Sequence, residues 1–220
     1  MGKIKRRTGR KWVDYNDTKV RKNGKFAKAT VKRRTNGKWV TISEEKHTKT
    51  WNASWTQSYG NDNKQKPAYS DLKRLYQGHF GDPDLGWYGD YWGRQRSMIG
   101  FPSGMSSELK GARIEKLELY LHIQHAWYWA GATAAIGVHN KDSKPSKFSN
   151  ERYDIKEVKY TSREQGKWIT MDKSIVNMFS KGTAKGFTLY KNTDNLNYYG
   201  YWYGMNDGNK KPKIRVTYYK

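Results

Sequence analysis

The chain has 220 residues, with 43 Lys+Arg against 20 Asp+Glu, a net charge of +23 and no Cys, and its 33 aromatic residues outnumber its 27 Leu, Ile and Val. The absence of Cys excludes disulfide scaffolds, Cys-ligated zinc and thiol catalysis. No apolar run is long enough for a membrane span, and the basic start lacks the apolar stretch of a signal peptide, so integral membrane and secreted proteins are not expected. Few aliphatic residues and high charge are typical of disorder, but Trp and Tyr bury large areas and favour a folded domain with an aromatic-rich core.

The first segment is basic and repetitive. Residues 1–50 hold 17 Lys+Arg and 4 Asp+Glu, and Ile4–Val13 matches Val31–Val40 at seven of ten positions. Asn23-Gly24 and Asn36-Gly37 are dipeptides that favour type I′ hairpin turns. We therefore predict that residues 1–45 form small β-hairpin repeats that act as a docking segment; its key residues are Arg6, Arg7, Trp12, Arg33, Arg34 and Trp39. Because isolated hairpins are marginally stable, we expect them to order against a partner; a solvated flexible arm is the alternative.

Three kinds of partner suit this basic segment. Lys and Arg can neutralise nucleic-acid phosphates, the anionic teichoic acids of a Gram-positive cell wall, or acidic patches on neighbouring proteins. A Trp at the same place in both copies, Trp12 and Trp39, favours a docking role, because a charged solubility tail does not require it.

Residues 46–93 read as a connecting strand followed by an aromatic loop. Thr48 to Tyr59 alternates between apolar and polar residues, as strands do. The stretch Gly86–Gly93 places Trp87, Tyr88, Tyr91 and Trp92 in a Gly-rich loop, where a strand's inward face could not bury all four. Exposed aromatic side chains stack on sugars or bases, or form subunit interfaces. These four are the predicted ligand or interface residues, with core packing as the alternative.

The same loop region carries three carboxylates. Asp82, Asp84 and Asp90 offer the oxygen ligands that Ca²⁺ prefers, although their spacing lacks the EF-hand pattern. They are a weak calcium candidate, and no other metal or cofactor is expected.

Residues 94–220 read as a series of short strands. The clearest runs from Lys116 to Trp129, and alternation predicts an inward face made of Leu117, Leu119, Leu121, Ile123, His125, Trp127 and Trp129. Further strands are predicted at Arg94–Phe101, Ala134–Val138, Tyr153–Tyr160, Lys167–Met171, Gly186–Lys191, Tyr199–Met205 and Lys213–Tyr219. One short helix is expected between an Asp172 N-cap and Gly182. This pattern predicts an all-β jelly-roll β-sandwich with one short helix.

No catalytic or metal motif stands out in these residues. His122 and His125 are three apart on the predicted strand, so they should point to opposite faces and not share a metal ion. The acids are scattered beside Lys or Arg, and no Ser-His-Asp order or phosphate-binding loop occurs. We therefore do not expect an enzyme.

The order of elements resembles a known family. Arg94–Phe101, Gly111–Leu121, the helix Ser174–Gly182, Gly186–Tyr190 and Pro212–Tyr218 together resemble the DNRLRE-type β-sandwich over residues 92–220. That resemblance implies a fold and no catalytic residues. The repeat ending in Gly-Lys-Trp-Val, placed ahead of such a sandwich, is similar to virion proteins of tailed phages that infect Gram-positive bacteria.

The phage resemblance implies a virion structural protein of the tail, baseplate, fibre or capsid surface, assembled in the host cytoplasm. The implied partners are other virion proteins, further copies of the same chain, and host cell-wall glycan or teichoic acid if the sandwich serves host attachment. Two alternatives stay open: a module that binds cell-wall polysaccharide, and a virion protein that binds nucleic acid.

Overall fold

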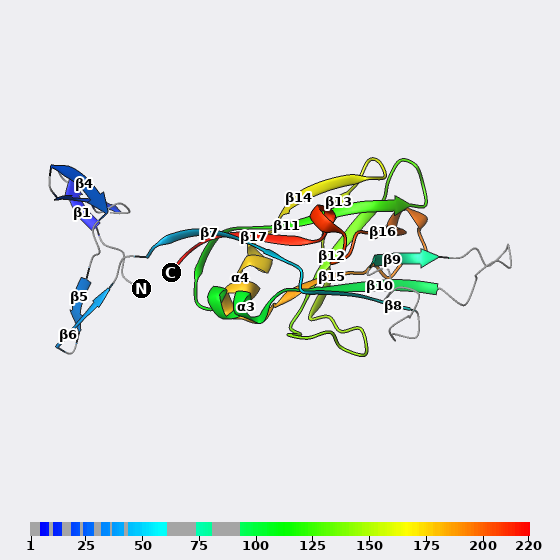
Figure 1. The fold of residues 1–220 in the computed structure, drawn as a ribbon, viewed down its shortest axis with the longest axis horizontal. Helices are drawn as coiled ribbons and strands as arrows, with labels where there is room; N and C mark the ends of the chain where they lie inside the picture. The colour runs from blue at the N-terminus through cyan, green and yellow to red at the C-terminus, as the bar shows by residue number, and fades with distance from the viewer. Residues whose placement is uncertain are drawn as a thin grey trace. The chain divides into compact units, whose positions relative to one another are not determined.

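The chain divides into two compact units, residues 1–45 and residues 46–220. The computed structural model describes residues 5–8, 11–14, 19–22, 24–28, 32–35, 37–41, 44–60, 74–80 and 93–220, and in the strands of the first unit it describes the backbone. Figure 1 labels helices and strands of both units.

The N-terminal unit contains three antiparallel hairpins, as the sequence predicted. Each is a separate two-stranded sheet. The pairs are β1 (Lys5–Thr8) with β2 (Lys11–Asp14), β3 (Lys19–Lys22) with β4 (Lys25–Lys28), and β5 (Lys32–Thr35) with β6 (Lys38–Thr41). Gly24 and Gly37 have φ angles of 76° and 77°, the positive values that a type I′ turn requires and that glycine adopts without strain.

The three hairpins share one register. In each hairpin, two four-residue strands pair along their whole length and are separated by two residues. The third residue of the first strand is an arginine, and it lies opposite an aromatic residue of the second strand. The pairs are Arg7 with Trp12, Arg21 with Phe26, and Arg34 with Trp39. The middle hairpin is therefore a third, diverged copy of the repeat, with Phe26 at the tryptophan position.

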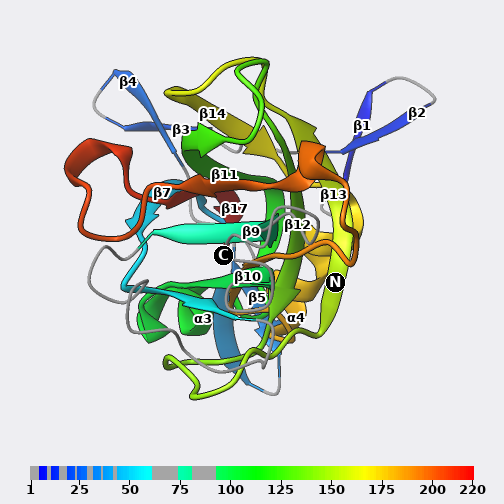
Figure 2. The ribbon, with the colours of Figure 1, turned by 90° about the vertical axis from the view of Figure 1, so that its right-hand side faces the viewer.

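The second unit is built on one curled antiparallel sheet. Its strands are β7 (Lys46–Asn52), β8 (Trp55–Tyr59), β9 (Leu75–Phe80), β10 (Gly93–Gly100), β11 (Arg113–Ala126), β12 (Thr133–His139), β13 (Arg152–Lys159), β14 (Gln165–Thr170), β15 (Gly186–Leu189), β16 (Gly200–Trp202) and β17 (Lys213–Tyr219). They follow the order β13-β12-β15-β10-β9-β16-β11-β17-β7, with β14 paired to β11 and β8 paired to β10. In Figure 2, β14 and β11 lie in the upper part of this unit and β10 lies in the lower part.

The core confirms the predicted all-β sandwich. Leu117, Leu119, Leu121 and Ile123 of β11 are all fully buried, as their alternation predicted. They belong to one apolar cluster together with Ile136 and Val138 of β12, Phe187 and Leu189 of β15, and Ile214 and Val216 of β17. Facing strands of the curled sheet thus bury their inward residues against each other, which is how a sandwich excludes water.

The predicted strand Thr48–Tyr59 is divided into β7 and β8. The break falls at Ala53, whose backbone N–H donates to Pro212 O, and at Ser54, whose N–H donates to Gly100 O. Because β7 pairs with β17 and β8 pairs with β10, the chain crosses here from one side of the sandwich to the other.

The described residues of the second unit form two short α-helices, the predicted one and one that the sequence did not predict. The additional helix is α3 (Ser103–Leu109), and the predicted one is α4 (Lys173–Lys181). Helix α3 buries Met105 and Leu109, which are four residues apart and share one face. The described residues also include two short 3₁₀ helices, η2 (Leu196–Tyr198) and η3 (Gly208–Lys210). Neither α-helix in the described part of the chain has the length and apolar run needed to cross a membrane.

Helix α4 has the predicted ends and buried face. Ile175 and Phe179 are buried, and Gly182 closes the helix with a φ of 73°. Asp172 occupies the N-cap position, but its carboxylate makes no capping hydrogen bond. Its Oδ1 instead accepts from the Lys156 ammonium at 2.8 Å.

Candidate functional site

The predicted docking residues lie on the paired strands of the N-terminal hairpins. Arg6, Arg7 and Trp12 belong to β1 and β2, and Arg33, Arg34 and Trp39 belong to β5 and β6. Their backbone pairing is described above, and their side chains lie outside what the structure describes.

The predicted aromatic loop and calcium candidate lie outside the described residues. Both fall in residues 81–92, which hold Trp87, Tyr88, Tyr91 and Trp92, and also Asp82, Asp84 and Asp90. Among the residues that the structure does describe, no group of three or more His, Asp or Glu side chains is arranged to hold a metal ion.

A β-bulge in β11 creates an exposed aromatic tip that the sequence alternation did not predict. Ile123 pairs with Trp202, but His125 pairs with the preceding residue Tyr201, so Gln124 is an extra residue in β11. An extra residue reverses the inward and outward positions that follow it. Ala126 is therefore buried, and β11 ends there.

The prediction that Trp127 and Trp129 face the core is consequently wrong. Trp127, Tyr128 and Trp129 follow the strand and are 39%, 45% and 79% exposed. We call these three residues the aromatic tip. Consecutive large aromatic side chains left in solvent mark a contact surface more often than a packing feature.

A fixed arginine supports the most exposed ring of the aromatic tip. The guanidinium carbon of Arg163 lies 3.9 Å from the centre of the Trp129 ring. Its nitrogens donate to Ala126 O at 2.6 and 3.1 Å and to Trp127 O at 3.2 Å. Three backbone hydrogen bonds hold the guanidinium still, and its stacking on one face of Trp129 orients the ring. With 79% of Trp129 exposed, the ring forms a platform whose other face can meet a ligand.

The turn at the aromatic tip depends on glycine. Gly131 N–H donates to Tyr128 O at 3.1 Å, and Gly131 has a φ of 92°. A Cβ at this position would lie 2.1 Å from Tyr160 O. Both the positive φ and the close backbone approach exclude any larger residue, so the turn is tightly determined.

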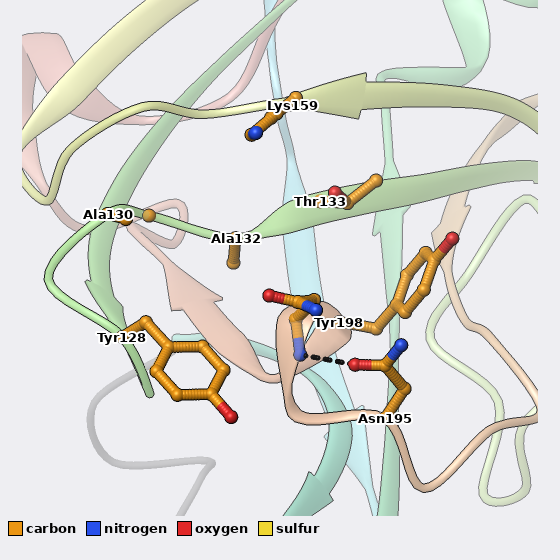
Figure 3. Close-up of a pocket in the computed structure, with 9 residues that line it drawn as sticks. Tyr128, Ala130, Ala132, Thr133, Lys159, Asn195 and Tyr198 are labelled. Atoms are coloured by element: carbon orange, nitrogen blue, oxygen red, sulfur yellow. Dashed lines mark hydrogen bonds between the residues drawn. The ribbon is translucent and has the colours of Figure 1, made fainter.

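A small pocket lies beside the aromatic tip. It has a volume of about 340 Å³ and is lined by Tyr128, Ala130, Gly131, Ala132, Thr133, Lys159, Asn195, Asn197 and Tyr198. These residues come from three segments that are distant in sequence: the turn leading into β12, the end of β13, and η2. Figure 3 shows Lys159, Tyr128 and Asn195 placed around the space from these three directions.

The pocket presents mainly hydrogen-bonding groups. Asn195 Oδ1 accepts from the Asn197 backbone N–H at 2.9 Å (Figure 3), which leaves the Asn195 amide nitrogen as a donor. Gln77 Nε2 donates to Thr133 O and to Tyr198 O, both at 2.8 Å. Buried Gln77 thereby links η2 to β12 by hydrogen bonds, which fixes the positions of two of the three pocket walls relative to each other.

One cation faces this pocket. Lys159 lines it and is exposed, and in the described parts of the chain no carboxylate pairs with the Lys159 ammonium. Two acids that lie next to lining residues in sequence, Glu157 near Lys159 and Asp194 before Asn195, are engaged elsewhere. Glu157 accepts from Lys191 at 2.8 Å and from the Tyr198 hydroxyl at 3.1 Å, and Asp194 accepts from Arg94 and His79.

The bulge also brings two histidines to the same face of the sheet, contrary to the expectation that they point apart. The ring of His122 packs edge-on against Tyr203, with ring centres 5.3 Å apart, and His125 stacks on Tyr201 at 5.0 Å. Tyr201 and Tyr203 flank the buried Trp202 and so share the outer face. Each histidine contacts a different tyrosine.

Both histidines favour the neutral state. Burial lowers the pKa of His122, and the Lys210 ammonium adds to this, while Glu164 opposes it. Burial likewise lowers the pKa of His125, with further contributions from Arg163 and Arg74. Neutral imidazoles packed on tyrosines behave here as aromatic components of the surface.

Taken together, the tip and the pocket offer flat ring faces, amide and hydroxyl groups and one cation. Such a set binds a polar ligand that has both flat apolar faces and many hydroxyl groups, because the rings stack on the faces while the amides pair with the hydroxyls.

Comparisons with known proteins give little further guidance. No family model and no curated protein matches the chain. Among solved structures, the chain is similar to the K1 cleaved adhesin domain of Lys-gingipain from Porphyromonas gingivalis, with a TM-score of 0.28 and 12% identity over 81% of this chain and 98% of that chain. A likeness at this level carries no argument about function.

Proposed function

We propose that this chain is a non-catalytic structural protein of a tailed-phage particle, and that its β-sandwich binds a host cell-surface glycan through the aromatic tip. The observation that carries the glycan part is the run of three exposed aromatic side chains, Trp127, Tyr128 and Trp129, directly beside a polar pocket. The phage setting is supported by the resemblance of the sequence to virion proteins.

A glycan fits this surface better than the other ligands considered. Sugar rings have apolar faces that stack on indole and phenol rings, and hydroxyl groups that pair with amides such as Asn195 and Asn197. A volume of about 340 Å³ lies near the lower end of the ~300–1,000 Å³ range of small-molecule sites, which suits one sugar unit. Trp129, oriented by Arg163, would extend the contact to a neighbouring unit.

The basic hairpins would attach the protein to the particle. Three copies in one register, each with an arginine opposite an aromatic residue, are what a repeated docking element would provide. The excess of Lys and Arg in this segment suits an acidic surface on a neighbouring virion protein.

Glycan binding is tested with the full chain and a panel of bacterial cell-wall polysaccharides, by calorimetry or biolayer interferometry. Aromatic stacking contributes about 1–3 kcal/mol per ring when measured on nucleic-acid bases, so Trp129→Ala should weaken binding by about 5- to 150-fold. Trp168→Ala is the matched control. Trp168 is another exposed tryptophan, with 38% of its surface accessible, but it lies on β14 and not in the aromatic tip. It should leave the affinity unchanged.

The result also separates a glycan site from a subunit interface. If Trp129→Ala changes the oligomeric state in sedimentation experiments while no polysaccharide binds the parent chain, the tip is an interface and the glycan proposal is wrong. Equal weakening by both substitutions would point to a general loss of surface hydrophobicity and would also refute it.

Docking is tested separately by incorporation into particles. A full chain with Trp12→Ala and Trp39→Ala should be absent from purified particles while retaining glycan affinity. The nucleic-acid alternative predicts instead that the parent chain binds DNA with an affinity that falls steeply with salt. Steep salt dependence together with unchanged incorporation of the variant would favour that alternative.

A further inference from the structure

The pocket beside the aromatic tip carries a positive charge that a neutral sugar would not use. We infer that it binds a glycan unit bearing an anionic group, with Lys159 pairing to that group. This inference rests on the proposed function and specifies the ligand of the same site.

The ion pairs around the pocket leave Lys159 available for an anionic ligand. Lys159 is the one charged side chain among the lining residues, and no described carboxylate is paired with it. Glu157 lies two residues before Lys159 on β13. Its carboxylate accepts hydrogen bonds from the Lys191 ammonium and the Tyr198 hydroxyl. The Lys191 ammonium also pairs with Asp154, so Lys191 holds both carboxylates and neither of them forms an ion pair with Lys159.

The acid on the opposite wall is similarly occupied. Asp194 precedes the lining residue Asn195, and both of its carboxylate oxygens accept from Arg94 at 3.0 Å. His79 Nδ1 lies 2.8 Å from Asp194 Oδ1. The Arg94 guanidinium, followed by His79, keeps the pKa of Asp194 below its usual range. Asp194 therefore remains committed to Arg94 and is not available to neutralise Lys159.

The polar groups of the pocket place the sugar part of such a ligand. The Asn195 amide nitrogen is left free to donate because its oxygen is used by the Asn197 N–H. The phenol ring of Tyr128, 45% exposed, borders the same space as Lys159. A sugar lying against Tyr128 can thus pair hydroxyl groups with Asn195 and its anionic group with Lys159, contributions that a bare inorganic anion would lack.

Carboxylate and phosphate groups share the required chemistry. A uronic acid supplies a carboxylate, and a glycerol phosphate polymer of the cell wall supplies a phosphate. Both leave the neighbouring hydroxyl groups free for the amides, and both pair with an ammonium ion.

The test uses the full chain and three probes. A hexuronic-acid oligosaccharide is compared with the same oligosaccharide after reduction of its carboxyl groups, which removes the charge and keeps the polyol, and a glycerol phosphate oligomer is the third probe. We expect at least one anionic probe to bind about fivefold more tightly than the reduced oligosaccharide, as a partly exposed ion pair allows. The preference should shrink with added salt.

Lys159→Gln should abolish this preference and leave the affinity for the reduced oligosaccharide unchanged. The matched control is Lys144→Gln, which removes the same charge at an exposed position in the loop between β12 and β13 and should keep the preference. The stronger of the two anionic probes identifies the source of the charge.

Each failure has a distinct meaning. Equal binding of charged and reduced probes, or a preference that survives Lys159→Gln, overturns the inference and leaves the glycan-binding function standing. Binding of none of the three probes, in a chain that also fails on the polysaccharide panel, overturns both.

Discussion

His139 on β12 gives the chain a defined acid sensitivity. Its side chain is fully buried, and its ring lies 5.2 Å from that of Trp55. Both ring nitrogens are used: Nε2 lies 2.9 Å from Ile99 O, and Nδ1 accepts from the Lys141 backbone N–H at 3.1 Å. This pair of contacts requires Nε2 to carry the hydrogen and Nδ1 to be bare, so the neutral imidazole fits and the protonated one does not.

The size of the effect follows from the pKa of His139. Burial lowers this pKa from 6.5 to about 4. Because the pKa of His139 is lower in the folded than in the unfolded chain, neutral His139 contributes its full share of the folding free energy above pH 6.5. This contribution is lost as the pH falls towards 4. Linkage then gives a loss of about 1.5 kcal/mol near pH 5.5 and about 2.5 kcal/mol near pH 4.5 from this residue.

Urea unfolding of the parent chain and of His139→Gln measures this contribution. Glutamine can donate to Ile99 O but does not titrate, so the variant should have a lower free energy of unfolding at neutral pH and a shallower fall between pH 6.5 and 4.5. Comparing the two chains also cancels the parallel contributions of His122 and His125, whose pKa values are lowered in the same direction. Identical pH slopes, or an NMR titration of His139 with its midpoint above pH 6, would refute the reasoning.

Three further predictions concern the turn at Gly131, the end of helix α4 at Gly182 and the support of Trp129 by Arg163. Gly131→Ala should destabilise the chain by more than about 2 kcal/mol in urea unfolding, because a Cβ would meet Tyr160 O at 2.1 Å. Gly182→Ala should cost only about 1 kcal/mol in the same assay, since its φ of 73° is also positive but its nearest contact would be a flexible side chain at 3.5 Å. Arg163→Lys removes the planar support from Trp129, so glycan affinity should fall in the parent chain but not in a chain that already carries Trp129→Ala; an equal fall in both chains would contradict the support role.

The strands could be predicted where local alternation reflects one buried face. Leu117 to Ile123 alternates through four fully buried positions, and Gly182 ends its helix as its residue type indicates. In both cases the deciding information lies within a few neighbouring residues. Helix α3 was missed because it has seven residues and buries two apolar side chains, too few to give a helical period.

The candidate site could not be predicted in the same way. The bulge at Gln124 is determined by the pairing of β11 with β16, a strand whose position depends on the whole sheet. The pocket likewise joins Tyr128, Lys159 and Asn195, which local patterns do not connect. One local signal did indicate the exposed tip. Gly131 follows the aromatic run after Ala130 only, and a glycine at such a place is typical of a turn. A turn there would end the strand and leave Trp129 in solvent.

If the three N-terminal hairpins dock as proposed above, their number affects how firmly the segment would hold its partner. Since each hairpin is a separate two-stranded sheet, the loss of one leaves the strand pairing of the other two intact. Three weak, tethered contacts act at a high effective concentration, and linking such modules can raise overall avidity by about 10²–10⁴-fold over a single one. Attachment would then weaken stepwise as hairpins are removed, and a bound chain could exchange one contact at a time without leaving its site.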